Sequence, residues 1–212
     1  MKRLFICFCL SVFTSICFAQ DAWKITATNI DSKAYYGVTV ANGMIGIISS
    51  PEVFKVKDVV LAGAYDLYGR GRVSNFLKSF NLLNMYMEVD GRRLSNSDVN
   101  SLQQSLDMKT ANFTTSFNYK DIATVSYTYY ALRQLPYAVL MDITVTAKKD
   151  FNLGSASVMA APDALKDVQN YYNEIDRPHT TISLLTSTAK SPTGKLLMCA
   201  SNAFIFSETH GS

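Results

Sequence analysis

The sequence predicts an all-β protein, built as a two-sheet antiparallel β-sandwich. The first observation is a period of two along residues 111–146, where three successive runs carry apolar side chains at alternate positions. The second is the pair Asn42-Gly43 between two β-branched runs, which is typical of a tight type I′ hairpin. A meander with one apolar face needs a second layer to cover it, and 48% apolar residues are enough for that core.

Residues 1–19 have the pattern of a secretory signal peptide. Lys2 and Arg3 form a positive start, an apolar run continues to Phe18, and Ala19 offers a small residue for cleavage. The run is shorter than the roughly 20 residues that a membrane-spanning helix needs, so no membrane span is predicted. We therefore expect export to the periplasm or the exterior, with residues 20–212 as the mature domain.

Charge and cysteine content indicate which partners and cross-links to expect. The formal charge of +3 includes two leader residues, and no basic stripe is interleaved with aromatic residues, so nucleic acid is not an expected partner. Removal of the leader takes three of the four cysteines, which leaves Cys199 and excludes a disulfide within the mature chain. Because Cys199 lies in an apolar run, we expect a buried, inert thiol.

The elements follow in order from the same patterns. We expect a tight hairpin at Asn42-Gly43, a second one at Asp90-Gly91 after a strand whose methionines are core residues, and one helical turn capped by residues 95–98. The expected strands are residues 23–28, 58–66, 84–89, 111–119, 124–131, 137–146, 155–159, 182–186, 196–200 and 203–207.

Two stretches lack a regular pattern. Residues 67–82 contain the breaker Gly69-Arg70-Gly71 and predict a long loop; no strand–helix context supports a phosphate-binding loop there. Residues 161–179 are polar, contain two prolines, and predict an insertion with one helical turn near residues 163–168. Binding residues are commonly found in such segments.

No catalytic, metal or cofactor site is predicted from the residues. His179 and His210 have no further His, Cys or carboxylate at metal-ligand spacing, and we expect both on the surface. A glycosidase needs two carboxylates across the scissile bond, and the sequence pairs none of its candidates. For each candidate, a solvated strand-edge or turn residue is a better interpretation than a catalytic carboxylate. The candidates are Glu52, Asp66, Glu88, Asp90, Asp163, Glu174 and Asp176.

Four landmarks together resemble the N-terminal domain of glycoside hydrolase family 65. They are Ala41-Asn42-Gly43-Met44-Ile45-Gly46, Leu61-Ala62-Gly63-Ala64-Tyr65-Asp66, the segment 85–94 with its Val89-Asp90-Gly91-Arg92 turn, and Ser105-Leu106-Asp107-Met108-Lys109-Thr110. Their order and spacing continue into the strands between residues 127 and 146. The resemblance covers residues 25–160 best.

The resemblance implies a galactose-mutarotase-like supersandwich that precedes a catalytic (α/α)₆ barrel. In the family the barrel carries the catalytic glutamate and acts on α-linked glucosides such as maltose, trehalose or kojibiose. No helical repeats of a barrel occur in this chain, so we expect an incomplete sandwich that is inactive by itself, within an inverting hydrolase. No catalytic residue can be carried over. The expected partner is an α-glucoside di- or oligosaccharide bound through the barrel. A homodimer is kept as an alternative for the oligomeric state.

The resemblance also implies that loops of the sandwich reach the rim of the active site. The rim candidates are Arg70 and Arg72 in the first irregular stretch and Glu174 and Asp176 in the second. A second hypothesis remains: a secreted sandwich that binds carbohydrate or a surface partner without catalysis. A free-standing mutarotase or lyase is less favoured, since both histidines lie outside the central strands.

Overall fold

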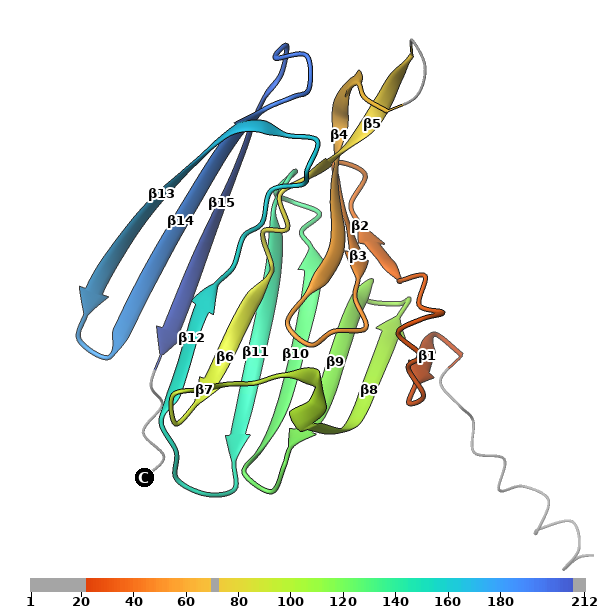
Figure 1. Cartoon of the computed structure of the whole chain (residues 1–212). Coiled ribbons are helices and arrows are strands. Elements are labelled where there is room, and N and C mark those ends of the chain that lie inside the picture. Colours follow the sequence, from red (N-terminus) through yellow and green to blue (C-terminus); the bar gives the residue numbers. More distant parts are fainter. Residues whose placement is uncertain (1–21, 70–72, 208–212) are drawn as a thin grey trace, which may run out of the picture.

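The computed structural model describes residues 22–69 and 73–207, which form antiparallel strands and one short 3-10 helix (Figure 1). The predicted all-β sandwich is confirmed, with its strands grouped into four hydrogen-bonded sheets. The predicted leader, Arg70, Arg72 and His210 lie outside the described residues. No helix in the described ranges is long and apolar enough to cross a membrane.

The largest sheet contains the meander that the period of two predicted. Its order is β1-β8-β9-β10-β11, with β1 Lys24–Ala27, β8 Val99–Asp107, β9 Asn112–Tyr119, β10 Ala123–Ala131 and β11 Val139–Ala147. Every second residue of β9, and of β10 as far as Tyr129, is buried, so the predicted faces are confirmed. The predicted helical turn is also confirmed as the 3-10 helix η1, Asn96–Asp98, directly before β8.

A four-stranded sheet with the order β2-β3-β4-β5 packs over the meander. It comprises β2 Thr39–Ala41, β3 Ile45–Ser49, β4 Val56–Leu67 and β5 Ser74–Ser79. The hairpin at Asn42-Gly43 is confirmed, but its turn is not type I′, because Gly43 has a positive φ of 91° and Asn42 does not. Instead the Asn42 side chain accepts hydrogen bonds from the amides of Met44 (2.9 Å) and Ile45 (3.0 Å).

The predicted long loop over residues 67–82 is wrong at residue 67 and at residues 74–79, which lie in strands. β4 extends to Leu67 and β5 begins at Ser74, and these two residues pair directly. The rings of Tyr65 and Phe76 meet edge to face at 5.1 Å across the pair. In this hairpin Asp66 is buried while the apolar side chains of Tyr65, Leu67 and Phe76 are exposed, so the apolar positions do not follow the buried face and the sequence does not reveal a strand.

A three-stranded sheet, β12-β6-β7, completes the front of the sandwich. Its strands are β6 Met85–Val89, β7 Arg92–Arg93 and β12 Leu153–Ser157. The hairpin predicted at Asp90-Gly91 is confirmed as type I′, because both residues have positive φ, 51° and 74°. The predicted role of the methionines is confirmed as well, since Met85 and Met87 are both buried.

The remaining sheet, β13-β14-β15, stands beside the others and overturns two predictions (Figure 1). β13 is Lys166–Arg177, β14 is Thr180–Lys190 and β15 is Leu197–Ser207. Most of the predicted insertion at 161–179 is therefore an edge strand, which is exposed along nearly its whole length and shows no apolar alternation. Cys199 is exposed rather than buried, because its neighbours Met198 and Ala200 point inward.

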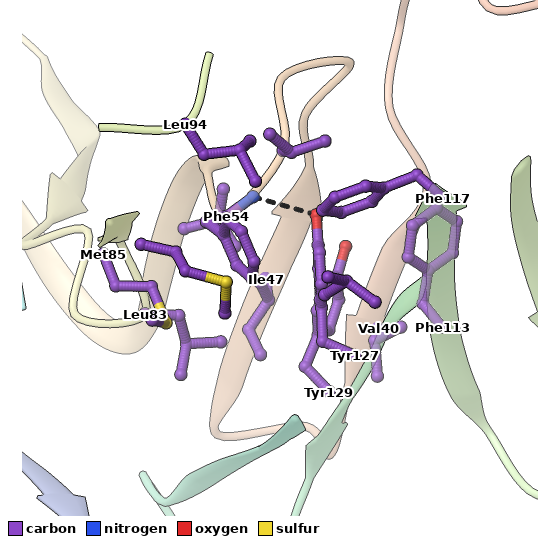
Figure 2. Close-up of a cluster of buried hydrophobic side chains, with 14 of the residues drawn as sticks. Val40, Ile47, Phe54, Leu83, Met85, Leu94, Phe113, Phe117, Tyr127 and Tyr129 are labelled. Atoms are coloured by element: carbon purple, nitrogen blue, oxygen red, sulfur yellow. Dashed lines mark hydrogen bonds between the residues drawn. The ribbon is translucent and has the colours of Figure 1, made fainter. Parts of the chain in front are cut away.

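Two apolar cores hold the sheets together. The main core lies between β2–β4, β6 and β9–β10, and Figure 2 shows Phe54 of the β3–β4 connection among its side chains. The second core joins the β4–β5 hairpin to the β13–β15 sheet. Its buried members are Ala64, Leu77, Phe80, Leu165, Ala189, Met198 and Ala200.

Candidate functional site

An open slot of about 950 Å³ lies between β11, β15 and the front sheet, β12-β6-β7. One side is formed by residues 139–145 of β11 and the other by residues 201–205 of β15. The floor is mostly apolar and comprises Leu82, Leu83, Met85, Met87, Leu153 and Ser155. Asp142 is the one ionisable residue among these lining positions, all of which are described. The slot therefore offers apolar surface and backbone, with a single carboxylate.

Three of the predicted carboxylates make structural contacts. Asp66 is buried and accepts hydrogen bonds from Thr193. Glu88 lies 4.0 Å from Arg93, and Asp90 accepts a hydrogen bond of 2.9 Å from the amide of Asn152. Asp66 lies on the β4–β5 hairpin, whereas Glu88 and Asp90 lie at the β6–β7 turn of the front sheet, and each of the three carboxylates is held by a structural contact of its own.

Glu174 and Asp176, the described rim candidates, lie on one face of β13. Glu174 is directly opposite Ser183, which in turn is opposite Phe204 of β15. Phe204 packs against the main core, so this face of the sheet is the one that turns toward the body of the sandwich. Both carboxylates are exposed there.

Both carboxylates have hydroxyl partners. The Tyr172 hydroxyl donates to Glu174 Oε2 at 2.6 Å, and the Thr181 hydroxyl donates to Asp176 Oδ1 at 3.1 Å. These contacts set the orientation of the two acidic groups on the inward-turned face of β13. Exposed tyrosine, hydroxyl and carboxylate groups are all capable of hydrogen bonding to a sugar.

His179 occupies the turn between β13 and β14 and is exposed, as predicted for a surface histidine. Its φ is 62°, in the left-handed region. Within residues 22–69 and 73–207, no group of three or more His, Cys, Asp or Glu residues could hold a metal ion.

Sequence reasoning missed a buried acidic site near η1. Asp98 is buried and lies 3.2 Å from both Arg92 and Lys120. Hydrogen bonds from Ser95 and Lys120 hold the pKa of the Asp98 carboxyl below its usual range. The sequence signal was the Ser95-to-Asp98 spacing of a capping box, which indicates the turn but not its distant lysine.

Comparisons with known proteins identify the family to which this sequence is similar. A family model described as "Glycosyl hydrolase family 65, N-terminal domain" matches residues 37–212. A kojibiose hydrolase of Mucilaginibacter mallensis is 66% identical over 201 residues, which are 95% of this chain and 29% of that protein. A kojibiose hydrolase of Flavobacterium johnsoniae is 49% identical over 191 residues, which are 90% of this chain and 28% of that protein.

This chain thus spans less than a third of the length of each of these relatives. The match begins before β2 and continues through every strand after it, including the landmarks from which the resemblance was drawn. The chain belongs to glycosyl hydrolase family 65, and residues 37–212 correspond to the N-terminal domain of that family.

Proposed function

We propose that this chain is the non-catalytic N-terminal domain of an exported hydrolase that acts on kojibiose or closely related α-linked glucosides. The observation that carries the proposal is the identity of 66% and 49% with two kojibiose hydrolases, over 95% and 90% of this chain. In this proposal the domain is a platform, and the part of the full-length protein beyond residue 212 carries out the hydrolysis.

The geometry of the described residues supports a platform. Hydrolysis of a glycosidic bond needs two carboxyl groups, about 5–10 Å apart, on either side of the bond. The slot contains one carboxylate, and the buried Asp66 and Asp98 bind Thr193 and Lys120 rather than facing a shared cavity. The two large cores show instead that the apolar residues of this domain are used for packing.

The leader supports hydrolysis rather than phosphorolysis. A phosphorylase retains the energy of the glycosidic bond in a sugar phosphate, which is of use inside the cell. An exported enzyme has little phosphate available and cannot readily use that product. The signal-peptide pattern of residues 1–19 therefore favours transfer to water.

The test begins with the gene beyond codon 212, where an in-frame helical barrel is expected. The full-length protein is then incubated with kojibiose, nigerose, trehalose and maltose, with and without phosphate. We expect glucose from kojibiose at a rate that phosphate does not change. Phosphate-dependent release of glucose 1-phosphate would contradict the hydrolase. If the reading frame encodes no barrel, the alternative of a secreted binding sandwich takes its place.

We also propose that Glu174 and Asp176, with Arg70 and Arg72, border the substrate entrance of the full-length enzyme. The exposure of both carboxylates on the inward-turned face of β13 supports this role. Glu174→Gln and Asp176→Asn should raise KM several-fold and leave kcat nearly unchanged. Asn173→Ala, on the opposite face of the same strand, is the matched control.

The arginine pair has its own test. Arg70→Ala and Arg72→Ala should lower kcat/KM for kojibiose in the full-length enzyme. Unchanged kcat/KM would remove these two residues from the proposed entrance, without affecting the proposal for β13.

A further inference from the structure

One edge of the largest sheet has open backbone groups along β11. Lys148 donates its amide to the carbonyl of Ile122 at 2.8 Å, and Leu132 donates to Ala138 at 3.0 Å, one at each end of the β10–β11 ladder. Hydrogen-bonded pairs alternate in an antiparallel ladder, so the even-numbered residues of β11 bond to β10. The odd-numbered residues direct their N–H and C=O groups away from it. Within the slot these are Val139, Met141, Ile143 and Val145.

β15 has the same arrangement at the edge of its own sheet. The amide of Ser191 donates to the carbonyl of Leu196 at 2.9 Å, at the end of the β14–β15 ladder where a turn connects the two strands. The even-numbered residues of β15 therefore bond to β14, and the odd-numbered ones point away from it. Within the slot these are Ser201, Ala203 and Ile205.

Both open edges border the same slot. Its walls are unbroken runs, residues 139–145 and residues 201–205, whereas contact with one face of a strand would involve every second residue. The wall along β11 is about 20 Å long at about 3.3 Å per residue. The floor of the slot includes the buried Met85 and Met87 and is apolar. The slot thus combines two unpaired backbone edges at its sides with an apolar floor.

We propose that an extended strand, from the part of the full-length protein that follows this chain, inserts between β11 and β15 and pairs with both. This inference rests on the proposed function, because it takes the chain to be the first domain of a longer hydrolase. It would convert two sheets into one continuous sheet. Alternate side chains of the inserted strand would be apolar, because one of its faces covers Met85, Met87 and Leu153.

Chain direction fits this occupant. β11 and β15 point the same way in Figure 1, with both arrowheads at the lower end. A strand that returns from β15 by a turn therefore runs antiparallel to both neighbours, as the other neighbouring strands of these sheets do. The relatives continue for more than twice the length of this chain, so they contain the necessary polypeptide.

A second copy of this chain fits the slot less well. The slot has a backbone edge on each side, so a strand that pairs with both must have both of its own edges free. Each strand described here is already paired with a neighbour on at least one side. Insertion of a strand from another copy would thus require that copy to give up part of a sheet.

Two proline variants of the full-length protein test the proposal. Ala203→Pro removes an N–H that points into the slot, and its ring would obstruct the inserted strand. Cys199→Pro is the matched control: it lies on the same strand and the same face, is also exposed, and also has its N–H directed away from β14, but it does not line the slot. On an open edge both prolines are tolerated.

We expect Ala203→Pro to lower the Tm of the full-length protein by at least about 3 °C, and Cys199→Pro to change it by less than about 1 °C. Amide exchange of the wild-type protein provides a second measurement, which stays informative if the Ala203 variant does not fold. Amides 139, 141, 143 and 145 should be as well protected as amides 140, 142 and 144.

Fast exchange of the odd-numbered amides, or equal Tm values for the two proline variants, would overturn the proposal. So would a dimer that dissociates in the Ala203 variant, because it would identify a second copy as the occupant. Neither readout depends on substrate. A full-length protein that protects these amides but does not cleave kojibiose would contradict the proposed substrate and leave the inserted strand in place.

Discussion

Asp66 accepts hydrogen bonds from both the amide of Thr193, at 2.9 Å, and its hydroxyl, at 2.6 Å and 2.7 Å to the two carboxylate oxygens. Asp66 lies near the end of β4, and Thr193 lies in the turn between β14 and β15. The contact therefore fastens the β4–β5 hairpin to the separate β13–β15 sheet, beside the second core. Hydroxyl hydrogen bonds, first from Ser191 and then from Thr193, hold the pKa of the Asp66 carboxyl far below its usual range.

The lowered pKa makes this contact sensitive to acid. Its contribution to the free energy of unfolding is fully present above the unfolded-state pKa of about 3.9, and it is lost as the pH falls through the lower folded-state pKa. We expect Asp66→Asn to reduce the free energy of unfolding at pH 7 and to weaken its decline between pH 5 and pH 2. Guanidinium titrations across that range provide the measurement. Asp163→Asn, at an exposed carboxylate, is the control, and identical pH profiles for the two variants would contradict the prediction.

Tyr127 supports a strained residue in the main core. Phe54 has a φ of 58°, donates its amide to the Tyr127 hydroxyl at 3.0 Å, and stacks on the tyrosine ring at 5.0 Å (Figure 2). Burial raises the pKa of Tyr127 to about 12, so the hydroxyl is neutral at physiological pH. Tyr127→Phe leaves the buried Phe54 N–H without this acceptor and should cost about 1–3 kcal/mol of unfolding free energy.

The matched control for Tyr127→Phe is Tyr130→Phe. Tyr130 also lies on β10 but is half-buried on the opposite face of the strand. We expect a change within about 0.5 kcal/mol in urea titrations. Equal losses for both variants would show that the Phe54 contact is not the cause.

Phe80 anchors the second core. Its side chain is fully buried, whereas Phe76 on the preceding strand is 45% exposed. Phe80→Ala should lower the free energy of unfolding by about 3–5 kcal/mol, because it removes a large buried ring and leaves a cavity. Phe76→Ala should cost considerably less, and chemical denaturation of both variants measures the difference. A comparable cost for both would contradict the assignment of Phe80 to the core between the hairpin and the β13–β15 sheet.

The proposed export leads to a prediction about the mature N-terminus. If residues 1–19 form a cleaved leader, mass spectrometry of the protein from the periplasm or medium should identify Gln20 as the first residue. Ala19→Arg should block cleavage and retain the precursor, while Ala22→Arg should be processed normally. Recovery of intact Met1 in the wild-type protein from the cytoplasm would contradict export.

Strong local patterns predicted several elements correctly. The alternation of Phe113, Phe117 and Tyr127 predicted the meander, because a period of two places side chains on opposite faces of any strand. Asp90-Gly91 predicted its turn because both residues accept positive φ. Asn42-Gly43 predicted the hairpin but not the turn type. Asn42 does not adopt the positive φ of a type I′ turn, and its side chain instead accepts hydrogen bonds from the amides of Met44 and Ile45.

The sequence by itself determined the fold class, the meander and the family, because alternation and turn residues act over a few neighbouring positions. Only the tertiary structure showed that residues 166–177 are an edge strand, that Cys199 is exposed, and that Asp66 meets Thr193 across 127 positions. It alone also brought the open edges of β11 and β15 to one slot. The physical reason is that β13 is exposed along nearly its whole length and so has no apolar alternation, and that contacts between sheets depend on a register and a packing which no local pattern contains.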